Sequence, residues 1–272
     1  MKKRVLCLVM AFAMVAASLM GCGGSNTKTE SEDGEKTVIK IGTRADMVNQ
    51  LEAVRDEIEA LGYTVEESIF DDSIQPDVAL AEGSIDINWY QHEPYLVSYN
   101  EKNGTDLVMI EPKTFLPLFA MFSNKWDSLD ELPDGAVIGL CNDATNQARG
   151  LNLLAKQGLI TLDPSAEVPT MFDVKENPHN FEFIEAEMSV LPQSLDDVDA
   201  ILLAAGHMVN AGLPADKYLC MDDDETYAVG FAVRAEDKDA KWAKEIAEAV
   251  QCDDLVEYFK TEKGGTQIPL WK

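Results

Sequence analysis

The sequence of 272 residues predicts an α/β protein of two lobes. Two observations carry this prediction. Strand-like and helix-like segments alternate along most of the chain, an order typical of mostly parallel sheets with helices on their faces. The same plan then occurs a second time, with little sequence repetition between the two copies. At about 100–200 residues per domain, the length is compatible with two small lobes.

The first copy of the plan begins with a strand at residues 37–42 and a helix at 45–61. Apolar residues recur at helical spacing through that helix, and Gly62 follows as its expected end. The other elements of this copy are a strand at 63–69, a short helix at 73–81 and a strand at 85–90.

The second copy begins with a strand at residues 136–141 and a helix at 144–157. A strand-like segment at 227–233 would rejoin the first copy, and an amphipathic helix at 237–258 follows it. The elements between them are a strand at 181–185, a short helix at 190–195 and a strand at 200–204.

This order predicts how the chain divides. Residues 37–124 together with 225–272 would form the first lobe, and residues 125–224 the second. We expect a ligand in the cleft between the lobes, at the carboxyl ends of the strands. Contacts to both lobes would favour a closed state through hinge motion.

The N-terminus predicts a signal peptide at residues 1–21, because three basic residues precede a short apolar run. The run is shorter than the roughly 20 apolar residues that a membrane-spanning helix needs. Its end, Leu19-Met20-Gly21-Cys22, resembles a bacterial lipobox, in which the cysteine carries lipid (palmitate included) after cleavage. The alternative is a plain signal peptide with an incidental cysteine. Residues 22–36 would then be the lipidated cysteine and a flexible polar tether.

The composition is strongly acidic, with 49 aspartates and glutamates against 22 lysines and arginines, a formal charge of −27. Loss of the signal peptide would leave 19 basic residues against 49 acidic ones, a charge of −30. This charge excludes nucleic acid as a partner and leaves the lipid anchor as the only expected membrane contact.

The residues that commonly act in catalysis or bind metals form no recognised motif in this sequence. We therefore expect no cofactor, no metal and no catalytic residue. Cys141, Cys220 and Cys252 would remain in the mature chain beside the lipidated Cys22. Since three is an odd number, at least one thiol is unpaired unless it bonds between chains.

The first candidate site is the run DINWYQHEPYL, which begins at residue 86. Strand alternation places Asn88, Tyr90 and His92 on one side. His92 and Tyr95 share a face if a helix begins directly after the histidine. Such a group of rings at a strand end would line a pocket for a small apolar or thioether group. The alternative is an ordinary aromatic patch of the core.

The second candidate site is the run CNDATNQAR at residues 141–149, which joins a strand to a helix. Asp143 or Thr145 would cap that helix, whose free N–H groups attract a carboxylate. Arg149, three residues after Asn146, could grip the same carboxylate with two hydrogen bonds. The alternative for this arginine is a surface salt bridge in an acidic chain.

These two runs, with SLDELPDG at 128–135 and LDDVDA at 195–200, resemble the NlpA family of methionine-binding lipoproteins of ABC importers. The resemblance covers nearly all of residues 38–272. It implies a type II periplasmic-binding-protein fold of two α/β lobes. It also implies a lipid-anchored receptor, and not an enzyme, that captures an amino acid, usually L-methionine, for a membrane permease and ATPase on the extracytoplasmic face of the cell membrane.

The resemblance further implies roles for single residues. His92 and Tyr95 match the lining of the family's thioether pocket, and Asn146 and Arg149 match the run whose arginine holds the carboxylate. The family usually adds two asparagines for the polar head of the amino acid. In this chain they fall on Ala204 or Gly206 and near Val229, so both polar anchors are replaced.

A buried ammonium group without acceptors costs several kcal/mol, so methionine in the family's usual pose is not expected. Substitute anchors are His207, Asp199 and the acidic run at 222–225. Three other interpretations stay open: a ligand without a free amine, such as an acylated amino acid; a surface antigen with a degenerate cleft; and a hydrolase that uses a histidine as base. The candidate ligand-binding residues are Tyr90, His92, Tyr95, Asn146, Arg149, Gly206, His207 and Val229.

Overall fold

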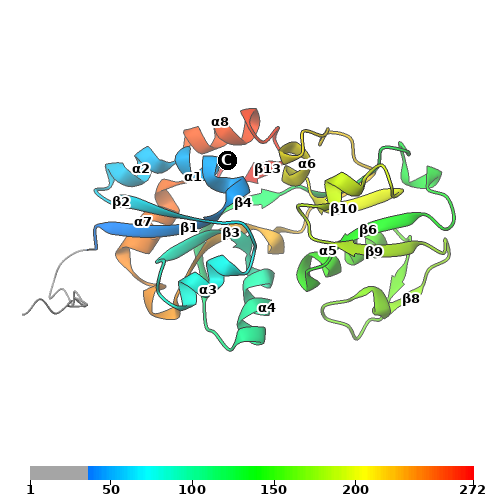
Figure 1. Cartoon of the computed structure of the whole chain (residues 1–272), viewed down its shortest axis with the longest axis horizontal. Helices are drawn as coiled ribbons and strands as arrows, with labels where there is room; N and C mark the ends of the chain where they lie inside the picture. Colours follow the sequence, from blue (N-terminus) through cyan, green and yellow to red (C-terminus); the bar gives the residue numbers. More distant parts are fainter. Residues whose placement is uncertain (1–35) are drawn as a thin grey trace, which may run out of the picture. The chain divides into compact units, whose positions relative to one another are not determined.

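The computed structural model describes residues 36–272, which form two main β-sheets covered by helices (Figure 1). The predicted signal peptide and Cys22 lie outside the described residues. The first sheet has six strands in the order β13 (Gln267–Pro269), β4 (Val108–Pro117), β12 (Val229–Val233), β3 (Ile87–His92), β1 (Val38–Arg44) and β2 (Thr64–Phe70). The second has five, in the order β11 (Cys220–Asp222), β5 (Phe119–Phe122), β10 (Ala200–Ala204), β6 (Val137–Cys141) and β9 (Glu182–Ala186).

Both sheets are mixed rather than mostly parallel. The predicted parallel pairs are present: β1 runs parallel to β2 and β3, and β6 runs parallel to β9 and β10. The other pairs are antiparallel: β12 runs against both of its neighbours β3 and β4, β13 runs against β4, and β5 runs against both of its neighbours β10 and β11. β5 and β12 are the strands that directly follow a crossing from the other sheet.

The chain passes between the sheets twice, through Leu118 and through residues 223–228. The backbone N–H of Leu118 donates to the carbonyl of Thr266, and its carbonyl accepts from the N–H of Ala205. The first crossing precedes the predicted boundary at residue 124, so residues 119–122 belong to the second sheet. Nothing in the local pattern marks this change, because the apolar strand residues continue across it.

Two predicted helices are interrupted. Residues 45–61 contain a 3₁₀ turn followed by α1 (Val48–Glu52) and α2 (Arg55–Ala60), and residues 237–258 contain α7 (Lys241–Ala249) and most of α8 (Asp253–Thr261). Val54 and Val250 lie at these breaks and are fully buried, so the apolar periodicity predicted burial correctly but not the breaks. The other helices are α3 (Gln75–Ala81), α4 (Glu93–Asn103), α5 (Ala144–Lys156) and α6 (Gly206–Asn210). The predicted short helix at 190–195 is a 3₁₀ turn at Leu191–Ser194.

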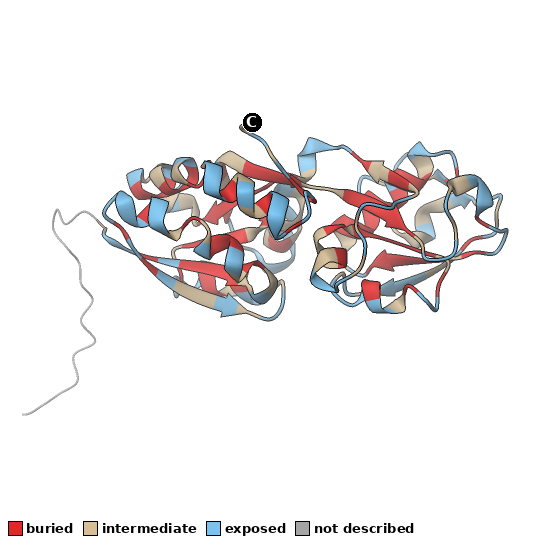
Figure 2. Ribbon diagram, turned by 90° about the horizontal axis from the view of Figure 1, so that it is seen from above, coloured by how far each residue is buried: buried red, intermediate tan, exposed pale blue. Residues whose placement is uncertain are grey.

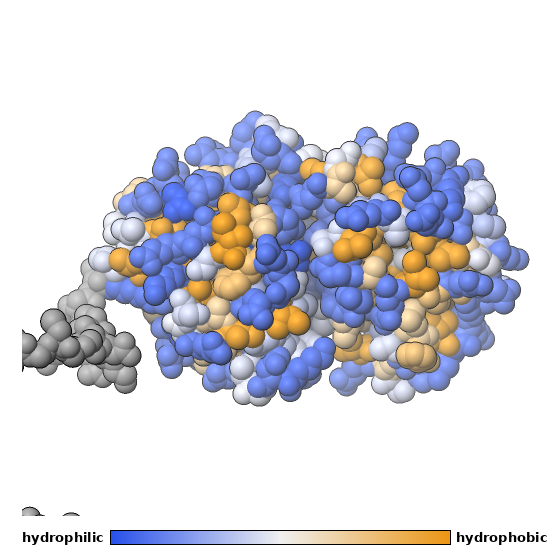
Figure 3. Space-filling view, in the orientation of Figure 1, coloured by the Kyte–Doolittle hydropathy of each residue, from blue (hydrophilic) through white to orange (hydrophobic). Residues whose placement is uncertain are grey.

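Each sheet has its own apolar core, and buried residues follow the strands and the inner faces of the helices (Figure 2). In the first core, the rings of Trp89 and Phe231 stack with centroids 4.8 Å apart. The indole N–H of Trp89 donates to the hydroxyl of Thr114 at 3.0 Å, and that hydroxyl donates to the carbonyl of Val229 at 2.9 Å. Polar side chains cover most of the outer face in Figure 3, with small separate apolar patches.

Truncation of the stacked ring tests this core. Phe231 is fully buried on a central strand, so Phe231→Ala is expected to lower the free energy of unfolding by about 3–5 kcal/mol through lost burial and a cavity. Phe172→Ala is the matched control, because Phe172 is 90% exposed and its loss should change stability by no more than about 0.5 kcal/mol. Urea denaturation measures the free energy of unfolding of both variants. Equal losses would contradict the placement of Phe231 in the core.

Candidate functional site

A cavity of about 960 Å³ is lined by residues of both sheets and their helices. Its size lies within the range of small-molecule sites. The ends of β3 and β10, the start of α5 and the first residues of α6 all contribute to it, as expected for a ligand cleft at the carboxyl ends of strands. The structure brings together all eight predicted residues in this lining: Tyr90, His92, Tyr95, Asn146, Arg149, Gly206, His207 and Val229.

An aromatic wall forms where β3 passes into α4. The phenol groups of Tyr90 and Tyr95 both donate to the carbonyl of Ser73, at 2.7 and 3.0 Å. The rings of His92 and Tyr95 are nearly perpendicular, with centroids 6.2 Å apart. His92 caps α4, because its Nδ1 accepts the backbone N–H of Tyr95 at 3.2 Å. The predicted helix start directly after the histidine is confirmed.

His92 is a neutral imidazole of defined tautomer. Since Nδ1 accepts a hydrogen bond, Nε2 carries the proton and donates to Oδ1 of Asn146 at 3.2 Å. Burial, and secondarily the charge of Arg149, lowers the pKa of His92 to about 4. This bond joins the first sheet's β3 to the second sheet's α5 across the cleft.

The start of α5 holds the amide of Asn146 in one orientation. Of the two predicted caps, Asp143 and Thr145, the structure has Asp143, whose Oδ1 accepts the backbone N–H of Asn146 at 2.9 Å. The side-chain NH₂ of Asn146 also donates to Asp143, at 3.1 Å. The amide therefore presents its oxygen to His92 and its nitrogen to the carboxylate.

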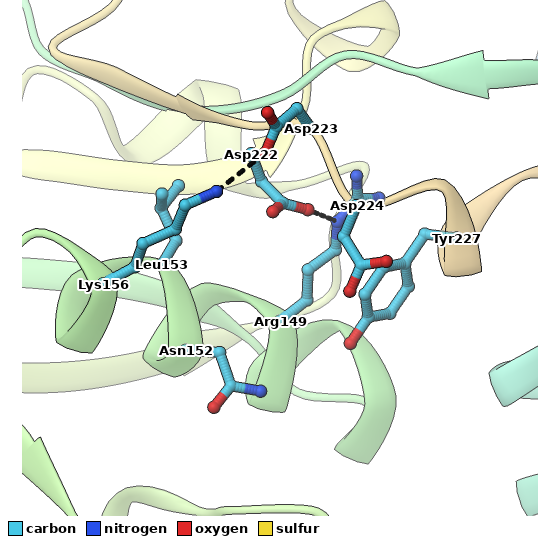
Figure 4. Close-up of a pocket in the computed structure, with 8 residues that line it drawn as sticks. All are labelled: Arg149, Asn152, Leu153, Lys156, Asp222, Asp223, Asp224 and Tyr227. Carbon is cyan, nitrogen blue, oxygen red and sulfur yellow. Dashed lines mark hydrogen bonds and ion pairs between the residues drawn. The ribbon is translucent and has the colours of Figure 1, made fainter.

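Arg149 is buried and already paired, contrary to the alternative of a surface salt bridge. It is 2% exposed, and its Nε donates to Oδ2 of Asp222 at 2.7 Å (Figure 4). The guanidinium lies between the rings of Phe119 and Tyr227, at 4.5 and 4.3 Å from their centroids. Burial lowers the pKa of Arg149, although the hydrogen bond and charge of Asp222 oppose this.

The guanidinium keeps donors for a further partner. Its Nη2 makes a long bond of 3.4 Å to the carbonyl of Pro117, and Nη1 has no hydrogen-bond acceptor among residues 36–272. Arg149 also borders a smaller pocket of about 450 Å³, whose other lining residues from α5, Asn152, Leu153 and Lys156, follow it along the helix (Figure 4). Asp222, Asp223 and Asp224 line this smaller pocket and not the cleft.

A charged cluster at another part of the cleft was not predicted. Asp46 accepts hydrogen bonds from Nε of Arg44 at 3.1 Å and from the amide of Asn210 at 3.3 Å. Nζ of Lys263 donates to the oxygen of the same amide at 3.0 Å and to the carbonyl of Asp46 at 3.1 Å. Asn210 on α6 thus bonds to two residues of the first lobe. No spacing in the sequence could have united positions so far apart.

The side chain of His207 faces this cluster and forms no hydrogen bond with any of residues 36–272. Its Nδ1 is 3.9 Å from Oδ2 of Asp46, which is too far for one. Burial lowers the pKa of His207 to about 4, so its ring is neutral at pH 7. His207 is part of the cleft lining.

The other proposed substitute anchors lie elsewhere. Asp199 is absent from the cleft lining, because it accepts the backbone N–H of Val137 at 2.9 Å and the indole of Trp126 at 3.3 Å. The acidic run is turned toward Arg149 and Lys156, with Asp223 bonded to the lysine at 2.7 Å. Both suggestions are therefore wrong, while apolar Ala204 and Val229 do line the cleft.

The described residues carry three free cysteines, of which Cys141 and Cys220 are buried. Between residues 36 and 272, no three His, Cys, Asp or Glu side chains converge on a position suited to a metal ion. Within the same range, no helix has the length and apolar character needed to cross a membrane.

The chain matches the NlpA lipoprotein family model over residues 39–271, and it belongs to that family. It is 35% identical to the D-methionine-binding lipoprotein MetQ of Escherichia coli K12, over 96% of this chain and 97% of that one. It is 29% identical to the methionine-binding lipoprotein MetQ of Bacillus subtilis, over 96% and 97%.

Solved structures agree with this family assignment. A nutrient binding protein of Burkholderia cenocepacia bound to methionine superposes with a TM-score of 0.80 at 33% identity, over 86% of this chain and all of that one. The methionine-binding protein MetQ gives 0.79 at 34% identity, over 86% and 98%. The expected two-lobe type II periplasmic-binding-protein fold is confirmed.

The two cleft histidines should titrate far below the usual range. The pKa of each falls from 6.5 to about 4 on folding, so the ring proton signals should not move between pH 8 and about pH 5. Between about pH 6.5 and 4 the unfolded chain binds more protons, and the free energy of unfolding should fall as pH is lowered through that window. NMR titration measures the shifts, with His92→Asn and His207→Asn to assign them; a midpoint near 6.5 would refute the assignment.

Proposed function

We propose that this protein is a lipid-anchored substrate-binding protein of an ABC importer, which holds a small amino-acid-like carboxylate between its lobes. The observation that carries the proposal is the cleft itself, where a buried arginine and a wall of rings line one cavity from opposite lobes. Two relatives are named for methionine binding, and one solved neighbour holds methionine. Methionine or a derivative is therefore the first ligand to test.

The carboxylate of the ligand would bind Arg149. A guanidinium has five N–H donors in one plane. The Nε of Arg149 can therefore donate to Asp222 while its Nη1 donates to the ligand. The paired aspartate keeps the arginine oriented, and the stacked rings exclude water from it. The apolar end of the ligand would then contact Tyr90, His92 and Tyr95.

In this pose the amine of the ligand has few hydrogen-bond acceptors. The side chains of Ala204 and Val229 offer no acceptor, and one of the two lone pairs of the Asn146 amide oxygen already accepts from His92. The neutral ring of His207 can accept one hydrogen bond, but a free ammonium has three donors. This supports a second candidate ligand, a carboxylate whose amine is acylated or absent.

Closure of two lobes would couple binding to transport. His92–Asn146 and Asp46–Asn210 already bond across the cleft, and a ligand that contacts both sides would add to the closed state. We assign residues 37–118 and 225–272 to one lobe and residues 119–224 to the other. The closed form would be presented to a permease and ATPase at the extracytoplasmic face, with the lipid on Cys22 as anchor.

A binding role is favoured over hydrolysis. Both ring nitrogens of His92 are engaged, with the backbone of Tyr95 and the amide of Asn146, so this histidine has no free lone pair to act as a base. His207 lacks a hydrogen-bonded acid that would orient it.

Arg149→Ala should weaken ligand binding by about 2–5 kcal/mol, since it removes the charged partner of a buried carboxylate. Calorimetry with L-methionine, D-methionine and N-acetyl-L-methionine measures the loss. Lys156→Ala is the matched control on the same helix, because Lys156 pairs with the exposed Asp223 outside the cleft. Unchanged affinity in Arg149→Ala would show that the arginine is structural.

Native mass spectrometry of the purified protein complements this measurement, since it weighs any ligand carried through purification. A bound mass of a small carboxylate supports the receptor. No bound mass, together with no heat from any of the three compounds, would favour a surface antigen with a degenerate cleft.

A further inference from the structure

Asp77 on α3 is a buried carboxyl group behind the aromatic wall. It is 0% exposed. Its Oδ1 accepts from the amides of Asn88 at 2.8 Å and Gln91 at 2.6 Å, and its Oδ2 lies 2.9 Å from the phenol oxygen of Tyr90. No lysine, arginine or histidine among residues 36–272 bonds to it. Burial raises the pKa of Asp77, because an unpaired charge is costly there, although the hydrogen bonds from Gln91, Asn88 and Tyr90 oppose this rise.

The phenol of Tyr90 has one proton and two neighbouring acceptors. These are the carbonyl of Ser73 at 2.7 Å and Oδ2 of Asp77 at 2.9 Å. A neutral Asp77 resolves this conflict: its O–H donates to Tyr90, and Tyr90 donates to Ser73. An ionised Asp77 instead attracts the phenol proton, and the carbonyl of Ser73 then keeps only its bond from Tyr95.

Ser73 joins this chain of hydrogen bonds to the cleft. It lies in the segment 71–75, all of whose residues line the cavity. Its hydroxyl accepts from Nη1 of Arg44, so one residue receives two phenols and a guanidinium. Tight hydrogen bonding at Ser73 therefore fixes this part of the cleft wall.

The helices around Asp77 form one packed unit with the wall. Leu80 of α3 and Leu96 of α4 belong to the same buried cluster, and Figure 1 shows both helices on one side of the first sheet. A change in the hydrogen bonds of Asp77 is thus transmitted to the cleft through tightly packed, buried neighbours.

We propose that Asp77 is a positioning residue of the cleft: in its neutral form it holds Tyr90 on Ser73 and so fixes segment 71–75 as a wall, and its ionisation loosens that wall. Both the protection of the segment and the affinity for ligand then fall as pH rises through the titration of Asp77. The statement about affinity rests on the proposed function, whereas the statement about the segment does not.

Other titratable groups face this site from each neighbouring element. Tyr90 of β3 and Tyr95 and Tyr99 of α4 have raised pKa values, chiefly through burial, and stay neutral. The remaining charged groups are Arg44 of β1, bonded to Asp46 and Ser73; Asp71 and Asp72 in the segment; and Glu82 beyond α3. The Asp77 variants below separate their contributions from that of Asp77.

Hydrogen exchange of the free, full-length protein tests the segment directly. As pH is raised from 4 to 8 and Asp77 ionises, amides of 71–75 in the wild type should lose about fivefold protection after correction for intrinsic rates, the effect of one hydrogen bond. Asp77→Asn should show high, pH-independent protection, because its NH₂ donates to Tyr90 as the neutral acid does. Asp77→Ala should show low protection throughout. Ser84→Ala, which removes a side-chain bond at the other end of α3, should keep the wild-type profile.

Calorimetry with L-methionine over the same pH range tests the effect on binding. Wild-type affinity should fall about fivefold with rising pH, while Asp77→Asn and Tyr90→Phe should give flat profiles. A wild-type pH profile in Asp77→Asn, in either measurement, would overturn the proposal. If L-methionine does not bind but the exchange profile is as expected, the proposed ligand fails while the positioning role stands.

Discussion

The buried ion pair of Arg149 and Asp222 is the interaction on which the rest of this molecule depends. The guanidinium contacts Phe119, which directly follows the first crossing, and Tyr227, which lies in the second. Removing either charge alone would leave the other buried and unpaired, which is strongly destabilising. The same group therefore organises the junction of the lobes and keeps free donors at the cleft.

Hydrogen-bond direction gives the cleft its chemical character. A chain of fixed donors and acceptors runs from the backbone of Tyr95 through His92 and Asn146 to Asp143. Each member has only one consistent orientation, because a carboxylate can only accept and a backbone N–H can only donate. The wall is thus preorganised before a ligand arrives, and little entropy remains to be lost there on binding. In the polar cluster around Asp46, at another part of the cavity, hydrogen bonds likewise fix the side chains before a ligand binds.

Much of the site was predictable because it sits where local rules apply. Strand alternation and capping chemistry located the Tyr90–Tyr95 run and the Asp143 cap, and all eight predicted residues line one cavity. Asp77, Asp46 and Lys263 were not identified from the sequence, because nothing in the neighbouring sequence distinguishes them from other charged residues. Their importance comes from burial and from partners far away in the chain, and neither leaves a periodic signal.

The sequence by itself determined the alternation of strands and helices, the burial of the apolar stripes and the residues at the strand ends. These depend on periods of two and 3.6 residues and on caps within a few positions. Only the tertiary structure decided the antiparallel strands, the crossing at Leu118 and the partner of Arg149. Arg149 and Asp222 are 73 residues apart, and such a pair is selected by the packing of two crossings against one helix and not by any local preference.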